Sequence, residues 1–155
     1  MIQEQIHPLN FDPIILAYKE GNNFGRLIEM DFVITAPGEL VYTIQIDQKH
    51  LAVPFAAHGG VVASLMDSTL GICALSLVCT DGLIVSTVEM KLNFLAPVRP
   101  GDVLTGYSKL LSKGKKLVVT EADIINQNGV IVAKGMGTFN AYPKEKAGYT
   151  TESRP

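Results

Sequence analysis

Asp67 is the residue of this chain that is best placed to do chemistry. It is the only charged residue among the 22 positions from His58 to Cys79. An unpaired carboxylate in such a stretch would take up a proton or cost several kcal/mol of folding free energy. Asp67 therefore needs a reason to be there. One reason is chemical, as a base or nucleophile. The other is structural, as a buried carboxylate bonded to backbone or to Ser64. The sequence before Asp67 favours the chemical reason.

That preceding sequence is His58-Gly59-Gly60, at the start of the predicted helix. The backbone N–H groups of a first helical turn are unpaired and lie at the positive end of the helix dipole. Those of Gly59 and Gly60 are therefore candidates to hold a developing oxyanion, although glycines also permit close packing. For His58 we favour a bond to backbone that fixes the loop over direct proton transfer.

The stretch from His58 to Cys79 is predicted to be one long buried helix. Apolar residues recur at steps of three and four, and others fill the flanking positions, so the helix is apolar over most of its circumference. Such a helix must be wrapped by other elements. The residues one turn on either side of Asp67 include Ala63, Ser64 and Gly71, which are small and leave a slot beside the carboxylate.

The spacing along this helix predicts an assembly of two chains. Gly60 and Asp67 are seven residues apart, which is about 10 Å of helical rise. An oxyanion donor and a base or nucleophile must both lie roughly 3 Å from one reacting centre. Two copies packed antiparallel about a two-fold axis would satisfy this, because Asp67 of one chain would then lie beside Gly59 and Gly60 of the other. We therefore expect a homodimer with shared active sites.

The remaining elements are predicted to form an antiparallel sheet. Residues 11–20 favour a short amphipathic helix capped by Asp12. Alternating patterns and turn residues predict strands over 26–35, 40–47, 84–94, 102–111, 117–125 and 130–140. The fold class is therefore α+β, a sheet wrapped around one long central helix. We expect one domain over 1–143, with 1–25 as a helical lid and 144–155 as a flexible polar tail.

Composition narrows the class of protein. A hydrophobic content of 47% with only 18% charged residues favours apolar surface buried between subunits. The net charge of −2 gives no basic footprint for nucleic acid. No leader or membrane span is predicted. Cys73 and Cys79 are six apart on the helix, which suggests neither a disulfide nor a metal site. We expect both to be reduced core thiols in a cytoplasmic protein.

Three motifs in this order resemble one known family. They are HGGVVASLMD, with Asp67 nine positions after His58, then STVEMKLNFLAPVRPGD, and VAKGMGTF near the end. Over about residues 25–142 the chain resembles the hotdog-fold acyl-CoA thioesterases, particularly the phenylacetate-pathway type. The resemblance implies the hotdog fold and hydrolysis of an acyl-CoA substrate to a carboxylic acid and CoA. It implies neither a metal nor a bound cofactor.

The resemblance also assigns roles. Asp67 corresponds to the catalytic carboxylate, either general base or nucleophile, and Gly59 to the N–H that polarises the thioester carbonyl, with Gly60 beside it. Thr87 corresponds to a hydroxyl that orients the attacking water. Strand alternation places Thr87 opposite the apolar face unless a β-bulge re-aims it. The family pairs edge strands into dimers and often joins dimers into tetramers.

Further residues are candidates to contact the substrate. Ser64 lies one turn before Asp67, and Phe55 is a candidate for the acyl pocket. Three cations are candidates for the CoA phosphates: Arg99, Lys113 and Lys115.

The chain departs from the family pattern before the helix. Six residues before His58, where the family commonly has an Asn, this chain has Ala52. Three residues before His58, where a Gly is common, it has Phe55. This departure keeps open an alternative, a non-catalytic acyl-CoA or lipid-binding regulatory protein with the same fold. Hotdog hydratases typically carry a His where this chain has Ile72, and dehydratases need a Glu on the central helix, which this chain lacks. Neither chemistry is therefore expected.

Overall fold

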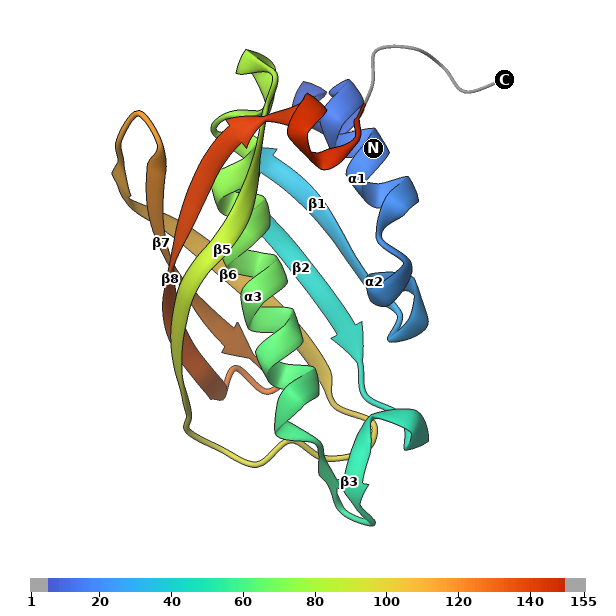
Figure 1. Cartoon of the computed structure of the whole chain (residues 1–155). Coiled ribbons are helices and arrows are strands. Elements are labelled where there is room, and N and C mark those ends of the chain that lie inside the picture. The colour runs from blue at the N-terminus through green and yellow to red at the C-terminus, as the bar shows by residue number, and fades with distance from the viewer. Residues whose placement is uncertain (1–5, 150–155) are drawn as a thin grey trace, which may run out of the picture.

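A curled antiparallel sheet of six strands wraps one long helix, α3 (Gly59–Ser76), in the computed structural model, which describes residues 6–149 (Figure 1). The strand order is β1-β2-β6-β7-β8-β5. The strands are β1 (Met30–Ala36), β2 (Glu39–Gln45), β5 (Leu83–Phe94), β6 (Val103–Lys113), β7 (Leu117–Ile125) and β8 (Ile131–Pro143). A separate small hairpin, β3 (Leu51–Val53) and β4 (Ala56–Ala57), precedes α3. The predicted sheet around a central helix is confirmed.

The helix α3 is the core of the molecule. Ten of its residues are buried: Val62, Leu65, Met66, Thr69, Leu70, Ile72, Cys73, Ala74, Leu75 and Ser76. It ends at Ser76, earlier than the predicted Cys79, because the next amides bond three residues back, Leu77 to Ala74 and Val78 to Leu75. Within residues 6–149 it is the one helix whose length and hydropathy would suit a membrane span, and 56% of it is buried inside the structure. The sheet therefore covers it as a core helix.

Side chains of α3 dock on the sheet at defined points. Gly106 of β6 lies beneath Thr69, and a Cβ at position 106 would collide with the Thr69 hydroxyl. The hydroxyl of Thr120 on β7 donates to the carbonyl of Leu70 at 3.1 Å. Near the end of the helix, the N–H of Gly38 donates to Ser76 Oγ at 2.8 Å. These contacts fix which face of α3 turns toward the sheet.

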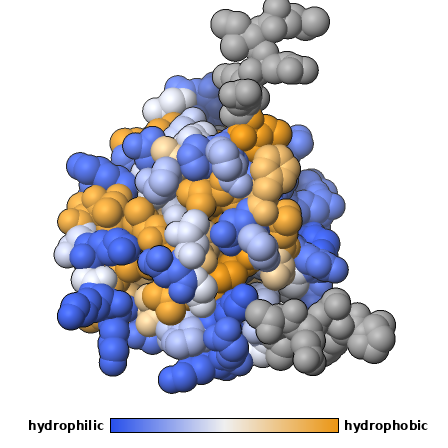
Figure 2. Space-filling view, turned by 90° about the horizontal axis from the view of Figure 1, so that it is seen from above, coloured by the Kyte–Doolittle hydropathy of each residue, from blue (hydrophilic) through white to orange (hydrophobic). Residues whose placement is uncertain are grey.

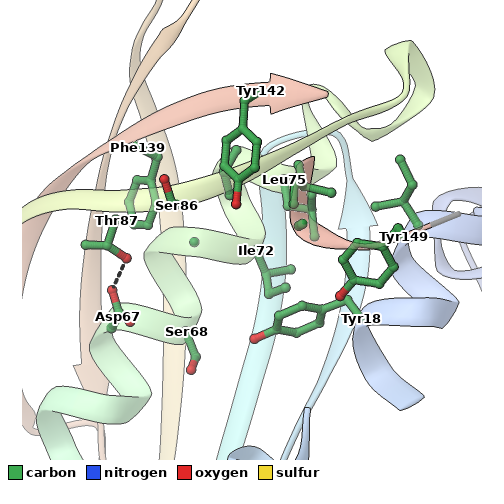
Figure 3. A pocket seen from close by; sticks show the side chains of 15 residues that line it. Tyr18, Asp67, Ser68, Ile72, Leu75, Ser86, Thr87, Phe139, Tyr142 and Tyr149 are labelled. Atoms are coloured by element: carbon green, nitrogen blue, oxygen red, sulfur yellow. Dashed lines mark hydrogen bonds between the residues drawn. The ribbon is translucent and has the colours of Figure 1, made fainter. Parts of the chain in front are cut away.

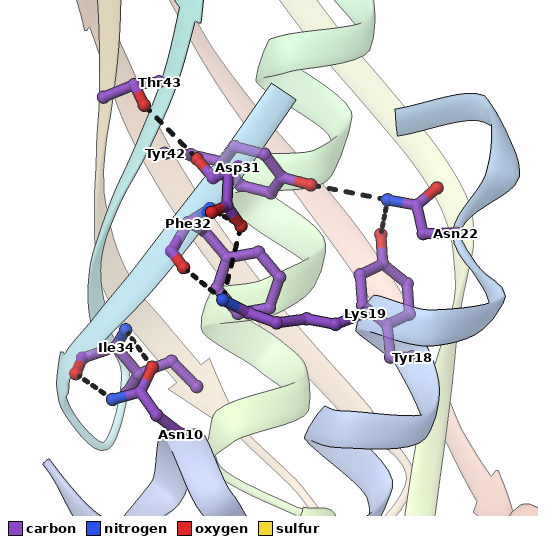
Figure 4. Close-up of polar contacts among 9 residues, drawn as sticks. All are labelled: Asn10, Tyr18, Lys19, Asn22, Asp31, Phe32, Ile34, Tyr42 and Thr43. Atoms are coloured by element: carbon purple, nitrogen blue, oxygen red, sulfur yellow. Dashed lines mark hydrogen bonds and ion pairs between the residues drawn. The ribbon is translucent and has the colours of Figure 1, made fainter. Parts of the chain in front are cut away.

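The N-terminal segment lies beside β1 (Figures 1 and 4). It contains the 3-10 helix η1 (Pro8–Phe11), α1 (Pro13–Gly21) and α2 (Asn23–Leu27). Asp12 caps α1 as predicted, because its carboxylate accepts from the N–H of Ile14 at 2.9 Å. The predicted strand from residue 26 is wrong in its first residues. Asn22 caps α2 there, and β1 starts only after Glu29, whose φ is +59°.

Strands β6, β7 and β8 are predicted strands that pair in sequence as an antiparallel meander, and β7 has the predicted bounds. Strand β5 contains a bulge, because Thr87 pairs with Phe139 of β8 while Glu89 pairs with the next residue, Thr138. Val88 is the extra residue. The simple alternation predicted for residues 84–94 is therefore wrong before the bulge, and Thr87 shares its face of the sheet with the buried Phe139.

The C-terminal segment differs in part from the predicted flexible tail. Lys144–Ala147 form a 3-10 helix, η4, and the N–H of Lys144 donates to the carbonyl of Gly82 at 3.2 Å. The ring of Tyr149 packs, partly buried, against the core. An aromatic ring in a polar segment gains from such burial. Residues 150–155 lie outside the described residues, as do residues 1–5 of the predicted lid.

Both cysteines are free and buried, as predicted. Burial raises the pKa of each thiol, Cys73 and Cys79, to about 11, so neither is a nucleophile near neutral pH. Some apolar residues are not buried. Seen from the end that carries α1, hydrophobic residues reach the surface in patches between hydrophilic ones (Figure 2).

Candidate active site

Asp67 and Thr87 meet between α3 and β5. The hydroxyl of Thr87 donates to Asp67 Oδ1 at 2.8 Å (Figure 3). The bulge at Val88 makes this contact possible, because it turns Thr87 toward the helix. Within residues 6–149 the other carboxylate oxygen of Asp67 has no protein partner. An ionised carboxylate accepts several hydrogen bonds, so Asp67 keeps room for a water or a substrate atom.

A cavity of about 370 Å³ opens beside this pair. Its walls come from α1, α3, β5, β8 and the C-terminal segment. Hydroxyl and carboxylate groups gather at one end, where Asp67, Ser68, Ser86 and Thr87 lie (Figure 3). Apolar residues make up much of the rest: Ile14, Ile72, Leu75, Ile84, Val85 and Phe139. The predicted slot beside Asp67 is present, with Gly71 in its wall.

Three tyrosines of the cavity wall were not predicted from the sequence: Tyr18, Tyr142 and Tyr149. Burial raises the pKa of Tyr18, and the negative charge of Asp67 adds to the effect. Its hydroxyl therefore stays protonated and able to donate. Tyr149 is the only aromatic residue in the polar C-terminal sequence, a signal that it has a place to pack.

The start of α3 offers one free backbone donor. His58 is the N-cap, and its Nδ1 accepts from the N–H of Gly60 at 2.8 Å. That bond matches the predicted attachment of His58 to backbone and occupies one of the two predicted oxyanion donors. The N–H of Gly59 has no partner within residues 6–149. The structure therefore leaves Gly59 as the donor at this helix start.

One chain does not bring Gly59 and Asp67 together. They are eight residues apart on the continuous helix α3, which corresponds to about 12 Å of rise. The cavity includes Asp67 and excludes the helix start. Phe94 of β5 lies against Gly59 instead. A single chain therefore keeps the two predicted groups apart, as the spacing predicts.

Two predicted substrate-binding residues lie away from the cavity. The hydroxyl of Ser64 donates to the carbonyl of Gly60 at 2.7 Å. Phe55 lies in the turn of the β3–β4 hairpin and is 76% exposed. Ala52, where the family commonly has Asn, is exposed on the same hairpin. The single chain therefore does not bring Phe55 into the acyl pocket.

The three predicted cations lie at two ends of the sheet. Arg99 lies just before β6, near the start of α3, since the neighbouring Val98 carbonyl accepts from the N–H of Ala57. Lys113 ends β6, and Lys115 lies in the turn that follows. An eleven-residue strand separates these positions by roughly 30 Å or more. One chain cannot direct all three at one phosphate group.

His50, which precedes the β3–β4 hairpin, is buried and structural. Its Nδ1 accepts from the N–H of Asp47 at 3.0 Å, and its Nε2 lies 3.0 Å from the carbonyl oxygen of Ile28. It therefore ties the segment before the β3–β4 hairpin to the turn before β1. No group of three or more His, Cys, Asp or Glu within residues 6–149 could hold a metal ion.

A family model described as the thioesterase superfamily matches residues 56–133. The chain belongs to the thioesterase superfamily. The matched segment runs from β4 through α3 to β8, so it contains both Gly59 and the Asp67–Thr87 pair. The prediction of a hotdog-fold thioester hydrolase is confirmed.

Individual thioesterases and related structures resemble this chain along most of its length. Human acyl-coenzyme A thioesterase 13 is 28% identical over 128 residues, which cover 81% of this chain and 89% of that protein. The structure of the E. coli PaaI protein from the phenylacetic acid degradation operon has a TM-score of 0.79 at 24% identity and covers 88% of this chain and 95% of that chain. That likeness shows the fold. A hypothetical thioesterase protein with coenzyme A from Streptococcus pneumoniae has a TM-score of 0.69 at 26% identity and covers 87% of this chain and 94% of that chain.

Proposed function

We propose that this thioesterase hydrolyses an acyl-CoA to a carboxylic acid and CoA, with Asp67 as the catalytic carboxylate. The observation that carries the proposal is the Thr87–Asp67 hydrogen bond at the mouth of a partly apolar cavity. The names of the relatives, which include an acyl-coenzyme A thioesterase and a thioesterase structure with coenzyme A, support this substrate class.

Asp67 can act as a general base. It would then take a proton from a water molecule while that water attacks the thioester carbonyl carbon. The carbonyl oxygen becomes an oxyanion that accepts a hydrogen bond from a Gly59 N–H. Collapse of this intermediate breaks the C–S bond and releases CoA as a thiolate that takes up a proton. Thr87, through its hydrogen bond to Asp67 Oδ1, would hold the carboxylate in the orientation that this requires.

Asp67 can also act as a nucleophile. Its free oxygen would attack the same carbon, break the C–S bond and form a mixed anhydride, which water then hydrolyses. A single turnover in ¹⁸O-water can establish the nucleophile route. The general base places the label only in the released acid. Label in the Asp67 carboxylate arises only from an anhydride whose Asp67 carbonyl is attacked by water.

The Gly59 donor must come from a second copy of the chain. The two groups are separated by about 12 Å in one helix, and β5 is an edge strand with a neighbour on one side only. Large apolar side chains are exposed along it, with Val88 at 59%, Phe94 at 57% and the adjoining Leu95 at 57%. Such an edge suits pairing with another strand. We therefore propose a homodimer through β5.

Contacts within the chain predict where the two-fold axis crosses β5. Gly59 lies against Phe94, and Asp67 is bonded to Thr87. A two-fold axis that brings Gly59 of one copy to Asp67 of the other also brings Phe94 to Thr87. The axis then crosses β5 midway between those positions, near Met90 and Lys91.

The catalytic proposal is tested by Asp67→Asn, which keeps the shape and removes the charge. We expect thiol release from a panel of CoA esters to fall at least a thousandfold, with an unchanged circular dichroism spectrum. Asp81→Asn, at an exposed position beyond the helix, is the matched control and should keep the rate. Equal rates for wild type and Asp67→Asn would overturn the proposal. Tight binding of a CoA ester without its hydrolysis by the wild type would favour the alternative of a non-catalytic acyl-CoA-binding regulatory protein.

The dimer proposal is tested by Lys91→Cys. On mild oxidation we expect a disulfide-linked dimer, because residues beside a two-fold axis come within bridging distance. Lys109→Cys is the control, since Lys109 is exposed on the inner strand β6. A linked dimer from the Lys109 variant alone would contradict the proposed axis.

A further inference from the structure

The C-terminal segment forms one end of the cavity beside Asp67. Ala147 and Tyr149 line the cavity together with residues of α1, α3, β5 and β8. Figure 3 shows the ring of Tyr149 next to Tyr18, on the side of the cavity away from the Asp67–Thr87 pair. The thioester carbon must lie at the Asp67 end under the proposed mechanism. An acyl group that enters from there would therefore point toward Tyr149.

The helix α3 gives the depth of this cavity. The lining residues of α3 run from Asp67 to Leu75, eight positions, which is about 12 Å of rise. An extended acyl chain advances roughly 1.3 Å per tetrahedral C–C bond of about 1.5 Å. About nine carbons therefore fit between the carboxylate and the far end.

The chemistry of the walls agrees with a chain of this kind. Beyond the polar end, the cavity is lined by aliphatic side chains, with Ile72 and Leu75 on one side and Ile14 of α1 on the other. Among residues 6–149 no lysine or arginine lines it, so these walls offer no partner for a charged acyl terminus. An uncharged aliphatic group is the occupant that they suit.

Tyr149 is held in a way that allows its side chain to be changed without disturbing the sheet. Only one described backbone bond joins its segment to the rest of the chain, from the Lys144 N–H to the carbonyl of Gly82; those of Gly148 to Glu145 and of Tyr149 to Lys144 lie within the segment. No strand or helix bond of the sheet core depends on the Tyr149 ring. Shortening this side chain should open the cavity while it leaves the fold intact.

We propose that Tyr149 is a specificity-determining residue that ends the acyl pocket and limits the enzyme to medium-chain acyl groups, about six to ten carbons long. This inference rests on the proposed function and adds the substrate class to it. Each methylene that the pocket accommodates should raise kcat/KM about fourfold. The gain should stop where the chain reaches the Tyr149 ring.

The test measures kcat/KM for straight-chain acyl-CoA esters of 4 to 16 carbons. For the wild type we expect a maximum near 8–10 carbons and at least a tenfold lower value at 14. Tyr149→Ala should raise the ratio of the 14-carbon to the 8-carbon value at least tenfold. Tyr149→Phe, which keeps the ring, should keep the wild-type profile, as should Tyr107→Ala, at an exposed tyrosine on β6 outside this cavity.

A second measurement separates this inference from the catalytic proposal. S-alkyl-CoA thioethers cannot be hydrolysed, so calorimetry can measure their binding to Asp67→Asn and to Asp67→Asn/Tyr149→Ala. If Tyr149→Ala shifts the preferred chain length of the bound thioethers in the same direction, the proposed role of Tyr149 is supported even when no ester is hydrolysed. A Tyr149→Ala profile parallel to the wild type, or a wild-type preference for 16 carbons, overturns it.

Discussion

The two edge strands of the sheet, β1 and β5, differ in what lies against their free sides. At β1 the N-terminal segment closes the edge: the Asn10 amide donates to the carbonyl of Ile34 at 2.8 Å and accepts from its N–H at 2.9 Å (Figure 4). Lys19 Nζ donates to the carbonyl of Phe32 at 2.7 Å. Between residues 84 and 94 of β5, no described segment bonds the backbone on the side away from β8.

This difference shows how one sheet can direct association to a single edge. An unpaired edge invites pairing with another chain, and proteins usually cover or charge the edges that must stay free. Here the open edge carries Thr87 and adjoins Gly59, and the covered edge carries neither the Asp67–Thr87 pair nor a contact with Gly59. The surface proposed for dimerisation and the parts of the proposed site therefore coincide.

The largest effect is expected when the open edge is charged. In Val88→Lys/Leu95→Lys both new charges replace side chains that are exposed in the single chain, so each protomer should fold. The dimer should dissociate, since lysines on an edge oppose pairing. The rate should fall by a hundredfold or more, about the loss expected for one oxyanion donor. Light scattering after gel filtration measures the mass, and a thiol-release assay measures the rate.

The matched control places the same charges at the closed edge. Leu27→Lys/Val33→Lys changes two side chains that are 71% and 48% exposed beside and on β1. This variant should keep the wild-type mass and rate. A monomeric β5 variant with the full rate would show that the site needs no second chain.

The second prediction concerns the hydrogen bonds by which Asn10 of the N-terminal segment covers the edge of β1. Asn10→Ala removes two buried hydrogen bonds and leaves both backbone groups of Ile34 unpaired. We expect the free energy of unfolding to fall by about 2–4 kcal/mol, measured from urea denaturation curves. Asn93→Ala on β5, which loses only an exposed contact with Lys91, should change it by less than about 0.5 kcal/mol. Equal losses from both variants would remove the distinction between the edges.

The central helix α3 and the inner strand β7 follow from the sequence more directly than the closed edge at β1. The helix α3 is predicted because its apolar residues repeat over many turns, and Asp67 stands out in it as the only charge. Strand β7 has clear turn residues on both sides. These signals are local, and a local pattern is enough to define an element.

What the sequence does not predict depends on contacts between distant segments. The bulge at Val88 is a matter of register between β5 and β8, so alternation alone places Thr87 on the wrong face. Capture of the Gly60 N–H by His58 depends on a rotamer. A lone aromatic residue in a polar segment indicates that Tyr149 packs somewhere, but it joins this cavity because the chain returns past α1, which the local sequence does not specify.

A smaller loss of stability is expected when the contact of Lys19 with β1 is removed. Lys19→Met keeps the apolar stem of the side chain and removes the ammonium group, which donates to Phe32 and lies 4.4 Å from the centre of its ring. Its ion pair with Asp31 is largely exposed and adds little. We expect about 1 kcal/mol lower stability in urea, against almost none for Lys91→Met. A larger loss at Lys91 would mean that the single chain relies on the open edge.

The smallest effect is a loss of stability in alkali. Burial raises the pKa of Tyr42, whose ring packs at 5.1 Å from that of Phe32 on β1. From about pH 9 upward the unfolded chain therefore binds fewer protons than the folded chain, and the free energy of unfolding falls as pH rises. This contribution is fully present below pH 9, and about 0.4 kcal/mol of it is lost by pH 10.

Tyr42→Phe isolates that contribution. The raised pKa values of Tyr18, Cys73 and Cys79 weaken wild type and variant alike in the same range, so they largely cancel in the difference between the two. Urea denaturation at pH 8 and pH 10 should show a drop about 0.4 kcal/mol smaller in the variant. Tyr107→Phe, at an exposed tyrosine, should follow the wild type. Parallel losses in all three proteins would mean that Tyr42 ionises as readily in the folded chain as in the unfolded one, and that the packing behind β1 is looser than its hydrogen bonds imply.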